Sequence, residues 1–224
     1  MKKILIVAAT AVEIEPFRER LIRDFEQVEN EVFERGNVQV RILVTGVGML
    51  LTAVHLTRYL AHENVDLVIN AGIAGAYHSD LNIGEVVAVI SEQLGDVGAQ
   101  ERDGGFTDIF EMKFIAPNEF PFVNACLVNE NPCQSLRLKE VKGLTVNKVH
   151  GEVHAIDFIR KKYQADIETM EGAAFFYICK THKIPFTQIR AISNYVEPRN
   201  RENWNIGLAI KNLNEVLWRN VFAK

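Results

Sequence analysis

The stretch Ile4-Leu-Ile-Val-Ala-Ala9, together with the segment that follows it, decides the fold. The stretch is too short and too rich in β-branched residues for a helix, and it is apolar on both faces. This is typical of a strand in the middle of a sheet that helices cover on both sides. Across residues 12–22 the apolar side chains recur at helical spacing. The chain therefore begins with a buried strand that leads into an amphipathic helix.

The same alternation of strand and helix continues to the end of the chain. Apolar, β-branched runs predict strands at residues 38–45, 66–70, 85–91, 144–149 and 186–193. Helical periodicity predicts helices at residues 49–61, 152–162, about 170–182 and in the C-terminal segment from 206. The pattern indicates an α/β fold, a three-layer α/β/α domain with a central mixed, largely parallel sheet. No linker or repeat divides the chain, so we expect one domain over residues 1–224.

Composition excludes several classes of protein. With 48% hydrophobic residues and 24% charged residues, the chain is an ordinary globular protein. Its 25 basic residues are scattered among 29 acidic ones, for a net charge of −4, which argues against nucleic acid as a partner. No apolar run approaches the ~18–20 residues that a membrane span requires. The N-terminus imitates a signal peptide, but Glu13 and Glu15 interrupt its apolar region.

Cysteine and histidine usage points to a cytoplasmic protein without a metal. The three cysteines (126, 133 and 179) form no CxxC pair and no zinc-like spacing, which indicates a reducing compartment. His150 and His154 are four residues apart, but they straddle Gly151 at an expected helix start. We therefore expect no metal site.

A phenylalanine-rich segment interrupts the regular pattern. Residues 92–121 show weak periodicity but contain Phe106, Phe110, Phe114 and Phe120. A loop this rich in aromatic residues is unfavourable in water, so we expect it to cover a site or to pack against a second subunit.

Polar and glycine residues follow the predicted strands where ligands usually bind. In α/β sheets that place is the carboxyl edge of the strands. After the strands predicted at residues 4–9, 38–45, 66–70 and 186–193 come, in order, Thr10 and Glu13, Thr45-Gly-Val-Gly48, Ala71-Gly-Ile-Ala-Gly75 and Ser193-Asn194-Tyr195. These residues form the candidate site.

Each candidate also has a plain structural interpretation. Gly46-Val-Gly48 is half of a dinucleotide-binding motif, but Leu51 replaces the third glycine and the next strand ends without an acid, so a tight turn is favoured. Glu13 and Glu171 could be solvated acids that the helix dipole favours at helix starts. The apolar neighbours of Glu171 nevertheless suggest that it is buried and has a partner. Asn194 could be a turn residue. The residues alone leave these alternatives open.

Six motifs in this order resemble one family over nearly the whole chain. They are Ile4-Leu-Ile-Val-Ala-Ala-Thr-Ala-Val-Glu13, Thr45-Gly-Val-Gly48, Asn70-Ala-Gly-Ile-Ala-Gly75, Ile83-Gly-Glu-Val-Val87, Met170-Glu-Gly-Ala173 and Ile189-Arg-Ala-Ile-Ser-Asn194. The chain resembles the purine nucleoside phosphorylase/5′-methylthioadenosine nucleosidase superfamily. The resemblance implies a purine nucleoside as substrate and a homodimer, which is usual in this family.

The resemblance is to the hydrolase branch of the superfamily and implies roles for particular residues. Glu13 matches the glutamate that activates water, and Glu171, after Met170, matches the glutamate that binds the ribose hydroxyls. The reaction, hydrolysis of an N-ribosidic bond, needs no metal or redox cofactor. Further residues expected to contact substrate are Val47, Gly72, Ile73 and Ser193.

Asn194 departs from the branch that acts on adenine nucleosides, where the resemblance predicts an aspartate that protonates N7. An asparagine cannot deliver a proton, but its NH₂ group can donate to O6 of a 6-oxopurine while its carbonyl accepts from N7–H. With adenine the amide would face donor against donor, at a cost of ~1–3 kcal/mol. The residue therefore predicts a hypoxanthine nucleoside as substrate.

The segment after Asn194 is rich in arginine. Arg199 or Arg201 could bind a carboxylate on the 5′ side of the substrate, with Trp204 as a stacking face. Alternatively, the arginines pair with Glu197 and Glu202, and Trp204 only packs. Other possibilities for the whole chain are an adenine nucleosidase, a 6-oxopurine nucleoside phosphorylase and a non-catalytic nucleoside sensor.

Overall fold

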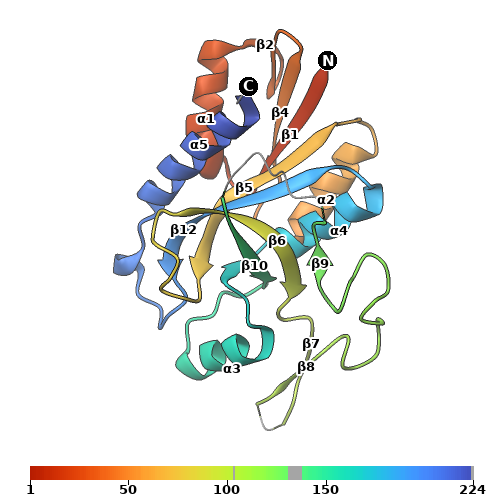
Figure 1. The fold of residues 1–224 in the computed structure, drawn as a ribbon, viewed down its shortest axis with the longest axis vertical. Helices are drawn as coiled ribbons and strands as arrows, with labels where there is room; N and C mark the ends of the chain where they lie inside the picture. The colour runs from red at the N-terminus through yellow and green to blue at the C-terminus, as the bar shows by residue number, and fades with distance from the viewer. Residues whose placement is uncertain (103, 131–137, 223–224) are drawn as a thin grey trace.

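A mixed sheet runs through the protein, and the computed structural model describes it over residues 1–102, 104–130 and 138–222 (Figure 1). Among these residues, ten strands pair in the order β11-β10-β6-β12-β5-β1-β4-β3-β2, with β9 beside β6. The strands are β1 (Lys2–Ala8), β2 (Glu26–Glu29), β3 (Val32–Arg35), β4 (Val38–Val44), β5 (Leu67–Ala76), β6 (Val86–Leu94), β9 (Leu127–Val128), β10 (Lys139–Thr145), β11 (Ile167–Thr169) and β12 (Phe186–Tyr195). A separate hairpin consists of β7 (Gly98–Gln100) and β8 (Phe106–Asp108).

Helices cover both faces of this sheet, as predicted. The helices are α1 (Ala11–Asp24), α2 (Met49–Leu60), α3 (Val153–Tyr163), α4 (Gly172–His182) and α5 (Ile206–Phe222). Figure 1 shows α1 and α5 together on one face and α2 and α4 on the other. The α/β fold class and the three layers are confirmed.

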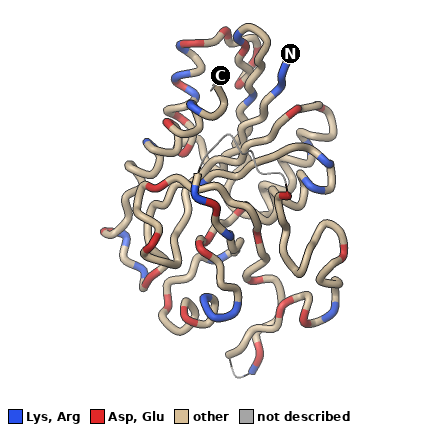
Figure 2. The backbone as a smooth tube through the Cα atoms, in the orientation of Figure 1, with Lys and Arg blue, Asp and Glu red and all other residues tan. Residues whose placement is uncertain are grey.

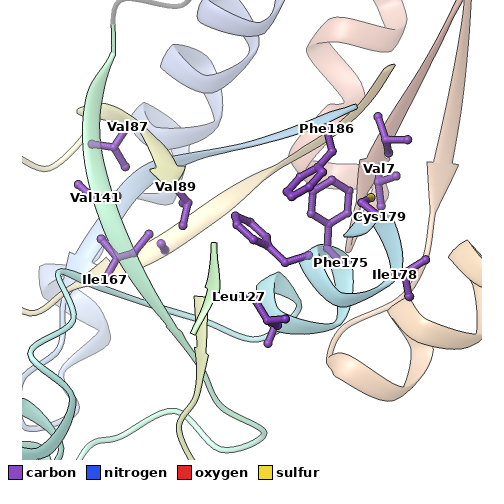
Figure 3. Close-up of a cluster of buried hydrophobic side chains, with 14 of the residues drawn as sticks. Val7, Val87, Val89, Leu127, Val141, Ile167, Phe175, Ile178, Cys179 and Phe186 are labelled. Carbon is purple, nitrogen blue, oxygen red and sulfur yellow. The ribbon is translucent and has the colours of Figure 1, made fainter. Parts of the chain in front are cut away.

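The two cores follow from the alternation of side chains along the strands. In β1, Leu5 and Val7 belong to the core beneath α2 and α4. Ile4 and Ile6, on the opposite face, belong to the core beneath α1 and α5. Figure 3 shows the first core, where the rings of Phe175 and Phe186 lie edge to face with centroids 5.6 Å apart.

The sheet curls back on itself at one end. Strand β11 pairs with β10 along one edge and antiparallel with β5 along the other, where Ile167 lies opposite Ala76. Strands β5, β12, β6, β10 and β11 thus form a closed ring, and α3 packs against it through Ile156 and Ile159. The small residues of β5 lie in this ring.

Several predicted elements differ from the observed ones. The 71–75 segment, expected after a strand, lies within β5, because its small residues pair along their length with β12 and in part with β11. The strand expected at 144–149 lies instead at Lys139–Thr145, where polar residues alternate with buried ones. Strands β2 and β3 were not predicted, because both are only four residues long and β2, with Val28 as its one apolar residue, is exposed along its whole length.

The phenylalanine-rich segment divides between the core and the surface. Phe110 is buried against Phe122, with ring centroids 5.0 Å apart, and Phe106 lies beside the Lys162 ammonium. Phe114 and Phe120 are 73% and 65% exposed. The segment therefore packs partly against its own chain and leaves two rings available to a partner.

The distribution of charges, apolar helices and cysteines in the structure bears on the expectations from composition. Basic and acidic residues are interspersed along the tube in Figure 2. No helix within the described ranges is long and apolar enough to cross a membrane. Across those same ranges no group of three or more potential ligands could hold a metal. Cys126 and Cys179 are free thiols, and Cys133 lies outside the described residues.

A carboxylic acid lies inside the closed ring of strands. Glu92 of β6 is fully buried and accepts hydrogen bonds from Thr145 Oγ1 at 2.8 Å, Gln188 Nε2 at 2.6 Å and Thr169 Oγ1 at 3.2 Å. Gly172, at the start of α4, leaves room for it, because a Cβ there would lie 1.9 Å from Glu92 Oε1. Burial raises the pKa of Glu92 to about 7 against these donors.

This pKa predicts that stability falls with rising pH. A raised pKa means that the folded protein favours the protonated form of Glu92. The contribution of this protonated acid to the free energy of unfolding is therefore complete below pH 4.5 and is lost as pH rises through about 7. We expect the free energy of unfolding to fall by about 3 kcal/mol across this window. In Glu92→Gln the fall should be absent, whereas Glu140→Gln, at an exposed acid of β10, should retain it. Urea denaturation at pH 5 and pH 8 measures the difference, and an equal fall in both variants would contradict the assignment.

Candidate active site

Glu13 is held at the carboxyl edge of the sheet by the start of α1. Thr10 is the N-cap, and it forms a capping box in which its N–H and hydroxyl both donate to Glu13 Oε2 at 2.9 Å. The other oxygen, Oε1, accepts from the Ile73 N–H of β5 at 3.1 Å. Glu13 is only 8% exposed, so the alternative of a solvated acid is wrong. The carboxylate is fixed in one orientation.

Gly72 provides the space beside this carboxylate. A Cβ on Gly72 would lie 2.9 Å from Glu13 Oε1 and 3.4 Å from Arg190 Nη1. The glycine therefore lets a carboxylate and a guanidinium approach the same point on β5. This is the structural reason for a glycine in a buried strand.

Arg190, on β12, is the functional candidate that the sequence reasoning missed. It is 1% exposed, and its guanidinium donates to Asn70 Oδ1 and to the Ile189 carbonyl. A signal was present, because a charged residue in the strand Ile189-Arg-Ala-Ile requires a buried partner. That partner is Glu171, whose Oε2 lies 4.0 Å from Arg190 Nη2.

Glu171 connects the Gly46-Val-Gly48 segment to the buried Arg190. It is the N-cap residue of α4, and its Oε1 accepts from the Gly48 N–H at 2.9 Å. Burial raises the pKa of Glu171 above its ordinary value, and nearby Glu13 adds to this, while Arg190 and the Gly48 N–H oppose it. Glu171 is 8% exposed, in agreement with the burial expected from its apolar neighbours.

The Gly46-Val-Gly48 segment is a tight turn, as favoured. Gly46 and Gly48 have φ values of 88° and 96°, which side chains rarely adopt. The turn directs a backbone N–H at a carboxylate of the same chain. The side chain of Val47 itself is 49% exposed, and Met170 is partly buried before Glu171.

Asn194 and Ser193 form a second group at the end of β12. The Ser193 hydroxyl donates to Asn194 Oδ1 at 2.7 Å, and the Asn194 amide donates to the Tyr195 carbonyl at 2.9 Å. These contacts orient the amide, with its carbonyl toward Ser193. A Cβ on Gly75 would lie 3.2 Å from Asn194 Nδ2, so this glycine also provides space. Asn194 is therefore an oriented hydrogen-bonding group with capacity left on both its oxygen and its nitrogen.

A narrow cavity of about 60 Å³ opens beside Asn194. Its walls include Gly75, His150, Glu168, Asn194, Arg199 and Trp204. The Arg199 guanidinium lies 5.6 Å from the centre of the Trp204 ring, and that of Arg201 lies 6.0 Å from it. Neither arginine has an ion pair within 4 Å among the described residues, so pairing with Glu197 or Glu202 is not observed. The two cations remain available to an anionic ligand.

A histidine with a buried acid borders the same cavity. His150 Nδ1 lies 2.5 Å from Glu168 Oε2, which also accepts from the Tyr77 hydroxyl at 2.8 Å. Glu168 is 5% exposed and Tyr77 is 3% exposed. Sequence reasoning considered His150 only as a metal ligand and missed the acid, because Glu168 is eighteen residues away in sequence.

The two groups lie at a distance that a nucleoside can span. Ile73, which binds Glu13, and Gly75, which lies beside Asn194, are two residues apart on β5, about 7 Å along the strand. The first group holds a carboxylate and a buried cation, and the second holds an amide and an imidazole. The arrangement can activate water at one end of a ligand and hydrogen-bond a heterocycle at the other.

The chain is similar to known proteins in both sequence and fold. The family model described as Phosphorylase superfamily matches residues 3–220. The futalosine hydrolase of Streptomyces coelicolor is 29% identical over 95% of this chain and 93% of its own. The 5′-methylthioadenosine/S-adenosylhomocysteine nucleosidase of Chromohalobacter salexigens is 30% identical over 87% and 85%. The structure of the futalosine hydrolase of Helicobacter pylori strain 26695 superposes with a TM-score of 0.81 at 19% identity, covering 98% of this chain and 97% of that one.

The fold and these similarities define the class of protein, an α/β enzyme of the nucleoside-processing type. The chain belongs to the phosphorylase superfamily, as the match over residues 3–220 shows. Within it the chain groups with the nucleosidases, which are N-glycosyl hydrolases.

Proposed function

We propose that this enzyme hydrolyses the N-ribosidic bond of futalosine and releases hypoxanthine, a step of menaquinone biosynthesis. The observation that carries the proposal is the oriented amide of Asn194 beside the cavity at the end of β12. Its free lone pair and free N–H match the N7–H and O6 of a 6-oxopurine. The relatives named futalosine hydrolase support the same substrate.

In the proposed mechanism, Glu13 is the general base. Its carboxylate takes a proton from a water molecule that attacks C1′ as the base departs, through an oxocarbenium-like transition state. Glu171 and the Met170 backbone hold the ribose, and Gly72 and Ile73 line its approach to the sheet. Arg190, whose Nη2 lies 4.0 Å from Glu171 Oε2, favours the charged form of Glu171 and so opposes the rise in its pKa that burial causes. Asn194, oriented by Ser193, stabilises hypoxanthine protonated at N7.

The 5′ side of futalosine carries an aryl carboxylate. Arg199 and Arg201 both lie beside the Trp204 ring without an acidic partner among the described residues. Guanidinium groups bind carboxylates through two parallel hydrogen bonds, and the indole offers a face for an aryl group. We therefore assign this segment to the distal part of the substrate, with Val47 at the rim of the ribose site.

A second candidate is a 5′-methylthioadenosine/S-adenosylhomocysteine nucleosidase, because a relative of that name is 30% identical. Asn194 argues against it, since an amide cannot protonate adenine. The deciding assay incubates the purified protein with futalosine, inosine and methylthioadenosine, each with and without phosphate, and separates the free bases. Hypoxanthine from futalosine without phosphate supports the proposal. Adenine release, phosphate dependence or binding without turnover would indicate the nucleosidase, a phosphorylase or a sensor, respectively.

Replacement of Glu13 tests the general base. Glu13→Gln should lower kcat by ~10²–10⁴-fold, because an amide cannot accept the proton of water. Binding of a substrate analogue, measured by calorimetry, should be largely retained. Glu19→Gln, at an exposed acid of the same helix, should leave kcat unchanged. Normal kcat in Glu13→Gln would refute this role.

Replacement of Asn194 tests recognition of the base. Asn194→Asp introduces a group that can protonate N7 of adenine and accept from its amino group. The ratio of kcat/KM for hypoxanthine over adenine nucleosides should fall about tenfold or more. Parallel kinetics on inosine and adenosine measure this ratio, and an unchanged ratio would overturn the recognition argument.

We also propose a homodimer. Exposed apolar side chains gather at the end of β4, in the turn that follows it and on α2: Val44 (42%), Val47 (49%), Leu50 (74%), Leu51 (43%) and Val54 (52%). Apolar patches of this kind favour association. Sedimentation velocity should give a mass near twice 25.4 kDa. Leu50→Glu should yield a monomer, whereas Val28→Glu, at an exposed position of β2, should not.

A further inference from the structure

The reaction requires a proton that Asn194 cannot provide. When the C1′–N9 bond breaks, its electron pair moves onto the purine, and the departure is easy only if the purine gains a proton. An asparagine side chain has no acidic proton to transfer at neutral pH. The proposed mechanism therefore lacks a proton donor at the base.

His150 borders the cavity in which Asn194 lies. Its side chain is 10% exposed, and its backbone N–H donates to Glu168 Oε1 at 3.2 Å. The ring nitrogen Nδ1 contacts the other oxygen, Oε2, at 2.5 Å. An ionised carboxylate only accepts hydrogen bonds, so Nδ1 carries a hydrogen and Nε2 is the nitrogen left for another partner.

Glu168 is held as an acceptor by three donors. Besides the two groups of His150, the Tyr77 hydroxyl donates to Oε2 at 2.8 Å. Burial raises the pKa of Tyr77, so this hydroxyl keeps its proton and remains a donor. A buried carboxylate beside Nδ1 stabilises a positively charged imidazole ring, as in catalytic acid–histidine pairs.

We propose that His150, oriented by Glu168 and Tyr77, is the general acid that protonates the departing purine, an inference that rests on the proposed nucleosidase function. Asn194 then recognises the base through O6, to which its NH₂ group donates, and His150 Nε2–H approaches N7 and supplies the proton. Only the N7–H formed by this transfer is a donor that the Asn194 carbonyl can accept from. The two tasks that one aspartate could perform are divided between two residues that line the same cavity, Asn194 on β12 and His150 before α3.

The proton balance closes. The imidazolium Nε2–H passes its proton to N7 as the C1′–N9 electron pair moves onto the purine, which leaves as neutral hypoxanthine. Water adds its oxygen to C1′ and gives its proton to Glu13. Afterwards Glu13 releases one proton to solvent and His150 takes one up. Glu168 stays ionised throughout, and Tyr77 and Glu168 act as positioning residues.

The test compares two leaving groups. Inosine needs a proton to leave, whereas 4-nitrophenyl β-D-ribofuranoside releases a stable anion and needs none. His150→Gln should lower kcat on inosine by ~10²–10⁴-fold, with KM nearly unchanged, and should leave kcat on the nitrophenyl riboside close to that of the wild type. His182→Gln, at an exposed histidine of α4, should change neither.

If circular dichroism shows that His150→Gln does not fold, a second variant provides the same test. Glu168→Gln keeps the size of the acid but removes the charge that stabilises the imidazolium, so the same selective loss on inosine is expected, to a smaller extent. Equal losses on both substrates, or no loss on either, would overturn the role of His150. If the wild type itself releases no base from any purine nucleoside, the proposed function fails instead.

Discussion

The guanidinium of Arg190 lies where the sheet, the Gly46-Val-Gly48 turn and the start of α4 meet. It is buried in β12, donates to Asn70 of β5 and faces Glu171 at the start of α4. A charge in this position is tolerated only with partners on several sides, because desolvation of an isolated cation is very costly. Glu171 in turn depends on the Gly48 N–H, and Gly72 leaves the space in which Arg190 approaches Glu13. The catalytic end of the site is thus one connected electrostatic unit.

The curled end of the sheet provides the second half of the site. Because β11 pairs with both β10 and β5, Glu168 is brought beside Tyr77 and His150, which lie far apart along the chain. The interior of the ring is polar around Glu92, and α3 closes its outer side. The candidate cavity beside Asn194 is lined by Gly75 of β5 and by Glu168 of β11, so its shape depends on this closure of the sheet.

The proposed mechanism assigns each chemical task to a different side chain. Water activation, sugar binding, base recognition and proton supply are assigned to Glu13, Glu171, Asn194 and His150. Three of these side chains are positioned by a neighbouring side chain: Thr10 orients Glu13, Ser193 orients Asn194, and Glu168 orients His150. Such second partners preorganise a site so that little reorganisation is needed during the reaction.

The amino-acid sequence by itself determined the layers and the chemistry at the strand ends. Runs such as Ile4–Ala9 predict buried strands because apolar side chains on both faces require cover on both faces. Glu13, Glu171 and Asn194 could be selected because they follow or precede such elements. The curl of the sheet, the burial of Arg190 and the contact of His150 with Glu168 were decided only by tertiary structure. They depend on pairings between distant segments, such as β11 with β5, and local periodicity carries no information about which strands meet.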